Sequence, residues 1–526
     1  MSSSSGVAPS HSENPAYRVR KRSHVRPILI GTALVALLLG AGIVLGRKFW
    51  PFSEKSVIED LAEASDSTVT IRSYHPTYFP VPGCVVEGIE FRHGNDHFRL
   101  ITIERMRIQG SYAGILTRHV LRITTERARV FIPPVASREV FHSRHSNLVV
   151  DELVANGSSV SFLSDDKNKQ PMRFDVHDAR FTGVRWGNPI SYRLKFHNPN
   201  PPGELAVSGN FGPWADGHHE DTPLSGGYKF DHADLSVYGA ITGTLNSDGK
   251  FGGAFKHLNV SGFTDIPDFE VKDGGHKVRL RARFDAFVNA TNGDTFLNQV
   301  QANFGRTSVI AAGSVAGSKE EKGKMAKLNL KSHNGRIEDI LGLFTTERAP
   351  MSGPVSLSSR VEIPSGDTVF LKKVRLHANF GVDNANFSKP DTQRDVDALS
   401  AGARGMNKED PETVLTDLKG KVDLVGGDAQ FTDLSFGEPG ANAHLHGTYN
   451  ILNYKINLHG LMRVDTKISK TSNGLKSFLL KVMDPFFKKK RKGEIVPVHI
   501  EGTYQRPQFG LDLGRPSSTP NAHRWR

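Results

Sequence analysis

Apolar and polar residues alternate with a period of two along most of the chain from Thr68 onward. The clearest segment is 277–288 (KVRLRARFDAFV), where the even positions are all apolar and positions 279, 281, 283 and 285 carry three arginines and an aspartate. This alternation predicts a strand with one dry and one wet face. Residues 235–241, 300–304, 374–382 and 496–500 follow the same rule. We therefore expect a mostly β protein built from antiparallel strands with one solvated face.

The dry face of such a sheet has to be covered. A second sheet, curling of the sheet on itself, or bound apolar ligands would each cover it. We expect an antiparallel sheet with few short helices, preceded by an N-terminal transmembrane helix, and the residue pattern leaves all three ways of covering the dry face open. Bound apolar ligands become attractive because the expected membrane helix places the sheet beside a bilayer, which is a reservoir of such ligands. The candidate lipid-facing residues are Val278, Leu280, Ala282, Phe284, Ala286, Val288, Val300, Phe304, Leu376 and Phe380.

Few segments have helical periodicity. Ser53 can cap a short helix that ends at Ala64, and Arg336–Phe344 carries a single apolar stripe. Residues 388–416 are the longest polar interruption, and we expect them to be flexible or partly helical. Loops are expected at 134–147 and 213–227.

Short sequence echoes suggest a repeated construction. Gly447-Thr448-Tyr449 recurs as Gly502-Thr503-Tyr504, with a weaker copy at Gly243, and 302–305 (ANFG) recurs at 378–381. Glycine at a fixed place in a strand is typical of a bulge or bend, which would curve the sheet.

The segment from Pro27 to Gly46 contains no charged side chain, and as a helix it would be about 30 Å long, the thickness of a bilayer core. It predicts a membrane span, although a cleaved signal peptide is the competing interpretation. The five basic residues between Arg18 and Arg26 favour a cytoplasmic N-terminus. The expected organisation is a disordered cytoplasmic tail (1–26), a transmembrane helix (27–46), an N-terminal β region (52–225), a C-terminal β region (226–513) and a disordered tail (514–526).

An amphipathic helix is expected at 473–487, and a basic run follows it. It could plug an open end of the sheet, or it could lie in a bilayer interface with its basic residues on anionic headgroups. The candidate membrane-surface residues are Leu475, Phe478, Leu479, Val482, Phe486, Lys488, Lys489, Lys490, Arg491 and Lys492.

The formal charge of +12 does not indicate nucleic-acid binding. Ten of these positive charges lie in the two clusters at 18–26 and 488–492, so the rest of the chain is near neutral. Both clusters fit a membrane surface better. The single cysteine, Cys84, excludes an intramolecular disulfide, and a buried small apolar residue is its simplest interpretation.

No catalytic signature is present. The chain lacks H-E-x-x-H, G-x-S-x-G and P-loop motifs. His218, His219, Glu220 and Asp221 cluster in a loop flanked by glycine and proline, and a solvated loop is a better interpretation of them than a metal site. We expect no enzymatic activity, no cofactor and no metal.

Several segments resemble the AsmA family of bacterial envelope proteins, which includes TamB-related proteins. The resemblance follows the N-terminal anchor and covers roughly 50–135 and 300–513. It rests on 77–83 (TYFPVPG), 86–89 (VEGI), 131–134 (FIPP), 351–353 (MSG), 420–436 (GKVDLVGGDAQFTDLSF), 439–441 (PGA), 446–449 (HGTY), 497–504 (PVHIEGTY) and 507–510 (PQFG).

The resemblance implies a single-pass protein of the bacterial inner membrane, with its bulk in the periplasm. It also implies that both β regions form one elongated, curled antiparallel β-groove with few short helices. This groove would shield lipid acyl chains and contribute to phospholipid transport and outer-membrane assembly. The alternative is a structural adaptor of the envelope that binds no lipid and acts on outer-membrane protein assembly. The expected partners are phospholipid, the inner membrane and other envelope proteins.

Overall fold

The computed structural model describes residues 52–93, 98–114, 119–132, 148–163, 170–215, 218–272, 274–317, 323–366, 369–404, 413–464, 494–503 and 506–511. The chain divides into two compact units, Met1–Val57 and Ile58–Arg526, and all the strands belong to the second. None of the described helices has the length and apolarity needed to cross a membrane. The expected span at 27–46, the two tails and the helix at 473–487 with its basic run lie outside the described residues.

The described part of the second unit contains one 27-stranded sheet, as expected of a mostly β chain. Its first part comprises β1 (Thr68–Thr70), β2 (Ser73–Thr77), β3 (Gly83–His93), β4 (Phe98–Gly110), β5 (His119–Glu126), β6 (Arg129–Ile132), β7 (Val149–Phe162), β8 (Met172–Arg185), β9 (Ile190–Pro199), β10 (Pro202–Phe211), β11 (Pro223–Asp234), β12 (Ile241–Thr242) and β13 (Thr244–Ala254). Its second part comprises β14 (His257–Val271), β15 (Val278–Asn289), β16 (Asp294–Phe304), β17 (Thr307–Gly317), β18 (Lys324–Arg336), β19 (Met351–Ser352), β20 (Pro354–Ile363), β21 (Arg375–Phe387), β22 (Thr416–Val425), β23 (Asp428–Glu438), β24 (Ala441–Asn450), β25 (Lys455–Val464), β26 (Glu494–Thr503) and β27 (Arg506–Leu511).

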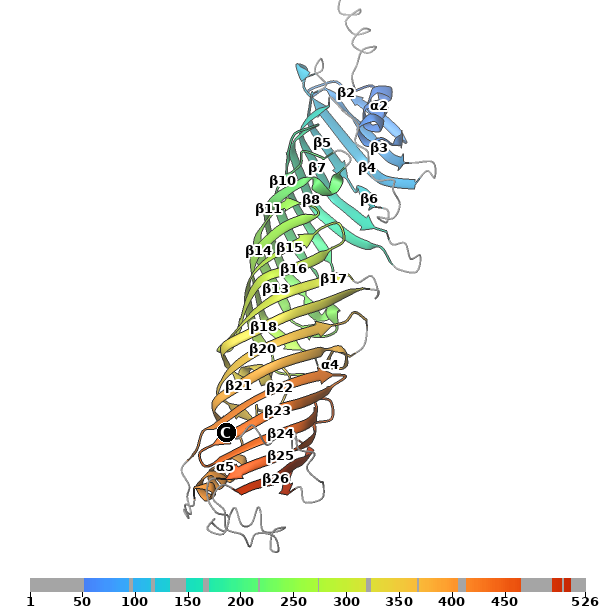
Figure 1. Cartoon of the computed structure of the whole chain (residues 1–526). Coiled ribbons are helices and arrows are strands. Elements are labelled where there is room, and N and C mark those ends of the chain that lie inside the picture. The colour runs from blue at the N-terminus through green and yellow to red at the C-terminus, as the bar shows by residue number, and fades with distance from the viewer. Residues whose placement is uncertain are drawn as a thin grey trace, which may run out of the picture. The chain divides into compact units, whose positions relative to one another are not determined.

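From β7 to β27, successive long strands pair with each other in antiparallel fashion (Figure 1). Two short strands, β12 and β19, add to the ends of β14 and β21. Strands β5 and β6 both pair in parallel with β7, which requires a crossover between β6 and β7. The domain boundary expected at 225/226 falls inside β11, and the ladder continues through it.

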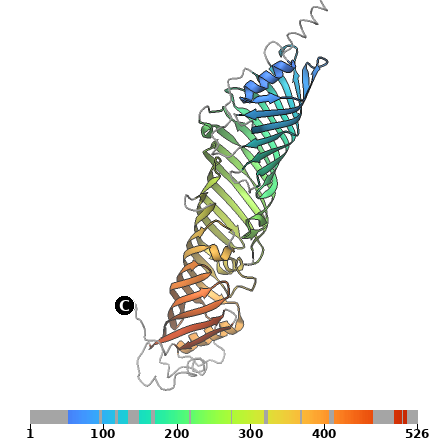
Figure 2. The same ribbon diagram turned by 90° about the vertical axis from the view of Figure 1, so that its right-hand side faces the viewer.

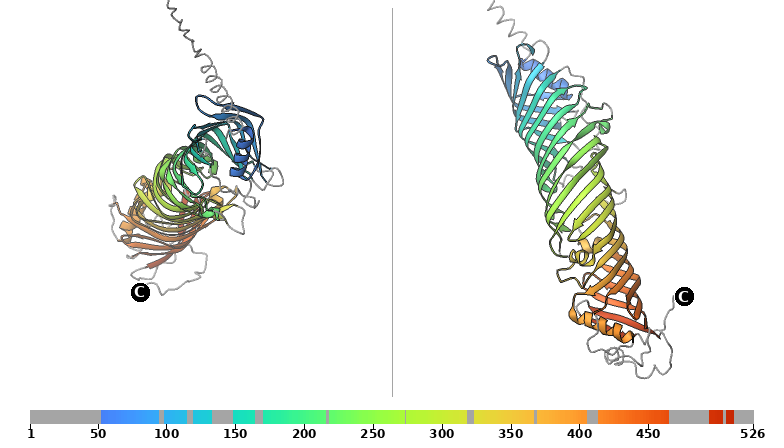
Figure 3. Two further views of the ribbon diagram at one scale, coloured as in Figure 1. Left: turned by 90° about the horizontal axis from the view of Figure 1, so that it is seen from above. Right: turned by 90° about the vertical axis from the view of Figure 1, so that its left-hand side faces the viewer.

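Strand β15 confirms the alternation of its sequence. Val278, Leu280 and the other even-numbered residues lie on one face, while Arg279, Arg281, Arg283 and Asp285 are exposed on the other. We call the face that carries the even-numbered residues of β15 the inner face, and the opposite one the outer face. The strands bend as they cross the sheet (Figure 3).

The strand expected at 235–241 is wrong in its first half. Residues Leu235–Tyr238 form a short 3₁₀ helix, η3, and only Ile241–Thr242 pairs as a strand. The Asp234 carboxylate accepts a hydrogen bond from Ser236 N at 2.8 Å, and Gly239 ends the turn with a φ of 68°. These local bonds compete with strand pairing and prevail over the apolar alternation.

The Gly-Thr echoes correspond to one backbone feature. Gly243, Gly447 and Gly502 all have positive φ, at 136°, 140° and 101°. A Cβ at Gly447 would stand 2.1 Å from Asn457 O on the neighbouring strand, so a larger residue would clash there. The glycines therefore mark places where the strand departs from regular geometry, as the echoes suggest.

The described helices are few and short (Figure 2). Helix α2 (Glu54–Ser65) begins where Ser53 Oγ accepts a hydrogen bond from Ser56 N, which confirms the predicted cap. Besides η3, the others are η2 (His219–Asp221), α3 (Ile337–Gly342), α4 (Phe370–Lys373) and α5 (Pro390–Ala403). Helix α5 occupies the polar interruption expected to be partly helical.

Buried apolar side chains are most numerous toward the two ends of the sheet, and fewer of them, such as Ile266 and Ala286, lie in the middle strands. Near the N-terminal end they include Val86, Ile89 and Met106. At the C-terminal end, Val355, Val382 and Ala385 form a cluster against which Ile337 and Ile340 of α3 pack. Two further clusters lie around Val361 and Leu434. The sheet therefore has packed cores at both ends.

Candidate functional site

The inner face of the middle strands carries an uninterrupted row of apolar and glycine residues. Each member lies directly opposite the next on the neighbouring strand, with one residue from each of nine strands between β9 and β18. At about 4.8 Å between strands, the row is about 38 Å long. We call it the inner row, and it consists of Leu194, Val207, Tyr228, Gly249, Gly262, Phe284, Val300, Ala311 and Leu330.

Every member of the inner row is half-buried and none is fully buried. This contrasts with the clusters at both ends of the sheet, where apolar side chains are almost completely covered. In the described residues, therefore, this middle stretch has an apolar lining that remains accessible to solvent. Leu330, at one end of the row, packs against the cluster around Val361.

Two aromatic rings cover the glycines of the row. A Cβ at Gly262 would stand 2.7 Å from the Tyr228 hydroxyl and 3.0 Å from Phe284 Cζ, and one at Gly249 would stand 2.7 Å from Tyr228 Cε1. The absence of side chains on both glycines lets these rings lie flat on the sheet. The Tyr228 hydroxyl has a hydrogen-bond partner in Ser247 Oγ at 3.0 Å, so the polar end of the ring is satisfied.

Charged pairs lie on the outer face of the same strands. Arg279 binds the Asp265 carboxylate through two nitrogens at 2.6 and 2.8 Å, and Arg281 lies 3.4 Å from it. The Arg279 guanidinium lowers the pKa of Asp265. In these strands, therefore, the inner face is apolar and the outer face carries ion pairs.

The candidate lipid-facing residues do not all lie in the same environment. Eight are half-buried, whereas Ala286 and Phe304 are buried. Leu376 and Phe380 pack against the C-terminal clusters. The half-buried residues outside those clusters, on strands β15 and β16, are Val278, Leu280, Ala282, Phe284, Val288 and Val300.

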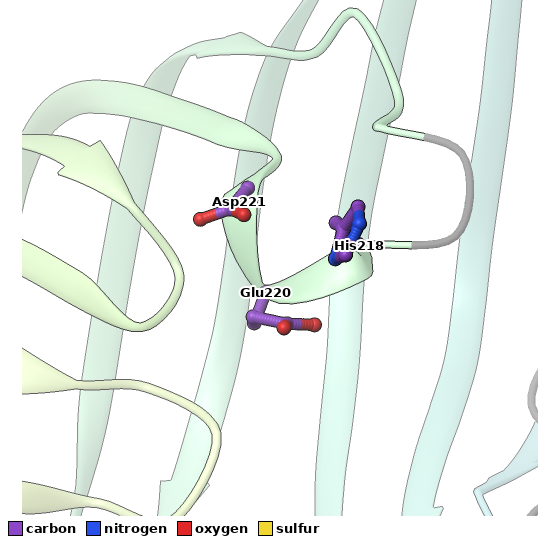
Figure 4. Close-up of side chains that lie close together, drawn as sticks. All are labelled: His218, Glu220 and Asp221. Carbon is purple, nitrogen blue, oxygen red and sulfur yellow. The ribbon is translucent and has the colours of Figure 1, made fainter.

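The loop cluster singled out in the sequence does bring three side chains together. His218, Glu220 and Asp221 have ligand atoms within 4.8 Å of one another around a single turn (Figure 4). The Lys256 ammonium forms an ion pair with Asp221, and the other two side chains are exposed. A lysine on one carboxylate already supplies a positive charge, so the arrangement is closer to a solvated loop than to a metal site.

Cys84 is confirmed as a buried residue, with 1% of its surface exposed. Burial raises the pKa of its thiol to about 12. The thiol therefore stays protonated and is a poor nucleophile at neutral pH.

A buried pair of carboxyl groups was not found by sequence reasoning. Glu438, at the end of β23, is 6% exposed, and Asp397 of α5 is 4% exposed. Within the described chain, neither Glu438 side-chain oxygen has a hydrogen-bond partner, whereas Asp397 Oδ1 accepts hydrogen bonds from Gln393 Nε2 and Val414 N, both at 2.8 Å. Burial, and secondarily the Asp397 charge, raise the pKa of Glu438 to about 8.

Comparison with known proteins adds no assignment to this geometry. No family model, no curated protein and no solved structure matches the chain.

Proposed function

We propose that this protein belongs to the AsmA family and shields phospholipid acyl chains along the inner face of its sheet. In this proposal the segment 27–46 anchors it in the bacterial inner membrane and the sheet lies in the periplasm. There it contributes to phospholipid transport and outer-membrane assembly. The observation that carries the proposal is the inner row, which is continuous over nine strands yet only half-buried.

An acyl chain that leaves the membrane without cover is exposed to water. Exposing a CH₂ group to water costs about 0.8 kcal/mol, so a chain of some fifteen such groups faces a barrier of about 12 kcal/mol. A continuous apolar strip lowers this barrier at every position along its length. It needs no specific polar contacts, which suits a lining made of aliphatic and aromatic side chains.

The inner row is also long enough to cover the acyl chains of a phospholipid. At about 38 Å it exceeds the depth of one leaflet, which is about 15 Å, or half of a 30 Å hydrocarbon core. A lipid on the row could therefore keep its acyl chains covered while its headgroup stays in water. The packed clusters at either end would limit this open stretch to the middle strands.

Lipid retention by the full chain tests the proposal. After purification in detergent and extensive washing, mass spectrometry should detect phospholipid bound to the wild-type protein. The double variant Leu280→Asp/Phe284→Asp should lose most of it, because two carboxylates would stand in the apolar lining. The matched control Arg283→Asp, on the outer face of the same strand, should retain it.

Circular dichroism of the three proteins separates loss of lipid from loss of fold. Equal lipid content in all three, with unchanged β content, would contradict the proposal. An unfolded double variant together with a lipid-free wild type would favour the adaptor function instead.

A further inference from the structure

A shallow groove crosses the outer face of β9, β10, β11 and β13, and we call it the outer groove. It has a volume of about 440 Å³, and three consecutive residues from each of the four strands line it. The central residue of each three belongs to the inner row, and its side chain points away from this groove. The backbone of these central residues therefore forms the floor, and the side chains on either side form two walls.

The strand register sets both walls. In the first wall each residue lies directly opposite the next, and its members are Arg193, Ser208, Gly227 and Lys250. The second wall lies two residues along each strand and consists of Lys195, Ala206, Lys229 and Asp248. From the spacing of strands and residues, the groove is about 14 Å long and about 7 Å wide between the walls.

Three of the four positive charges in these walls have no counterion. Among the residues that the structure describes, Arg193, Lys195 and Lys250 form no ion pair and no side-chain hydrogen bond. The Lys229 ammonium lies 2.8 Å from the Asp231 carboxylate on its own strand. Other cations of the outer face do have such partners, as the bidentate pairing of Arg279 with Asp265 shows.

Two carboxylates near the groove do not cancel this excess. Asp248 is in the second wall, on the same strand and face as Lys250, and Asp178 of β8 lies directly opposite Lys195. Within the described part of the chain, neither aspartate forms an ion pair. The walls themselves thus carry four positive charges and one negative charge.

The centre of the outer groove is open because small residues occupy it. A Cβ at Gly227 would meet only Gly249 O, at 3.4 Å, which is an ordinary contact. In contrast, a Cβ at Gly226 would stand 2.3 Å from Ser208 O. Packing therefore requires glycine at 226 but not at 227, where its absence of a side chain keeps the groove open.

The cations converge on one point of the groove, above Ser208. Arg193 is directly opposite this serine, at a Cβ separation of about 4.5–5.5 Å, and Lys195 and Lys229 are its diagonal neighbours at about 7–8 Å. The Ser208 side chain is exposed, and its hydroxyl can donate a hydrogen bond. A guanidinium, two ammonium groups and a hydroxyl together match the oxygens of a phosphate group.

We propose that the outer groove binds the phosphate group of a phosphate monoester. Arg193 would bind two phosphate oxygens, Lys195 and Lys229 would neutralise the charge, and the Ser208 hydroxyl would donate a hydrogen bond. The esterified group would lie along the floor toward Gly227 and Lys250. This site is on the face opposite the inner row, so it is separate from the shielding of acyl chains. A soluble phosphate ester and a lipid headgroup are the two sources of such a phosphate.

Calorimetric titration of the full chain in a neutral detergent tests the site. The two probes are glycerol 3-phosphate and dihexanoyl phosphatidic acid, which carries the same phosphate group on a lipid. We expect saturable binding of one equivalent by the wild type. Arg193→Gln/Lys195→Gln should weaken it about tenfold or more, because hydrogen bonds to charged groups contribute at least that factor. Gly227→Val should weaken it too, since the side chain would fill the centre while every charge remains.

A matched control removes two positive charges from the same face outside the groove. Arg281→Gln/Arg283→Gln, on β15, should bind both probes as the wild type does. Similar affinity for the two probes would identify a soluble ester as the ligand. Phosphatidic acid binding that is at least tenfold tighter, and is weakened by Arg193→Gln/Lys195→Gln, would identify a lipid headgroup.

Three results would overturn the proposal. They are no saturable binding of either probe, unchanged affinity in Arg193→Gln/Lys195→Gln, and an equal loss in the β15 control. Phosphatidic acid binding that is lost in Leu280→Asp/Phe284→Asp but kept in Arg193→Gln/Lys195→Gln would support the inner row and contradict the outer groove. The two proposals can therefore fail separately.

Discussion

Val382→Asp should unfold the C-terminal core of the sheet. Val382 is 0% exposed and lies between Val355 and Ala385, under the apolar side of α3. The substitution removes a buried aliphatic side chain and buries a carboxylate, and both effects destabilise the fold. We therefore expect a loss of about 4 kcal/mol or more in the free energy of unfolding. Urea denaturation, together with hydrogen exchange of peptides from β20 and β21, measures it.

Phe284→Asp is the matched comparison in the middle of the sheet. Phe284 is only half-buried, so the same carboxylate would keep contact with water and should cost only about 1 kcal/mol. Equal destabilisation by the two substitutions would mean that the inner face is as tightly covered at Phe284 as at Val382. In that case the inner row would be an ordinary core.

Glu438→Gln should remove most of the pH dependence of α5 docking. Helix α5 packs against β21 and β24, and Ser400 Oγ donates a hydrogen bond to Pro439 O, beside Glu438. The charged groups that act on Glu438 are Asp397, which raises its pKa, and Arg404, which lowers it. Burial is the largest cause of its elevated pKa.

The direction of this pH dependence follows from proton linkage. The folded protein holds the Glu438 proton up to a pKa of about 8, against an ordinary value of 4.5, so folding binds this proton more tightly. The stabilising contribution is complete below pH 4.5 and is lost as pH rises from 4.5 to 8, by up to about 5 kcal/mol. Glutamine, which stays neutral, should be equivalent at pH 5 and more stable at pH 8.5.

Hydrogen exchange of the α5 peptide, corrected for the intrinsic pH dependence of exchange, measures the effect. Wild-type α5 should open more readily at pH 8.5 than at pH 5, and the Glu438→Gln protein should not. Asp428→Asn, an exposed acid at the start of the same strand, is the control and should behave as the wild type. The same pH slope in wild type and Glu438→Gln would show that another group is responsible.

The alternation of apolar and polar residues predicted the sheet because, within each strand, it shows on which face each side chain lies. The alternation in 277–288 placed Leu280 and Phe284 on the inner face and Arg281 on the outer face, as the structure has them. Alternation reveals the face on which a side chain lies, not how deeply that face is covered. Ala286 and Phe304 follow the same pattern as Phe284, yet they are buried.

The features that sequence reasoning missed depend on contacts between distant segments. Glu438 and Asp397 come from a strand end and a helix 41 positions apart, and nothing local to either residue indicates burial. The turn at Leu235 was missed because its signals, Asp234 and Gly239, flank a segment whose apolar spacing also fits a strand.

A photo-crosslinking scan along β15 is the most direct test of whether phospholipid lies on the inner face of the sheet. A benzophenone amino acid would replace each residue from Val278 to Asp285 in turn, in cells whose phospholipids carry a radioactive phosphate. We predict a period of two: labelled lipid should be attached to the protein at the even-numbered inner-face positions and absent at the odd-numbered outer-face positions. Absence of lipid adducts at Leu280, Ala282 and Phe284, or equal adducts on both faces, would contradict it.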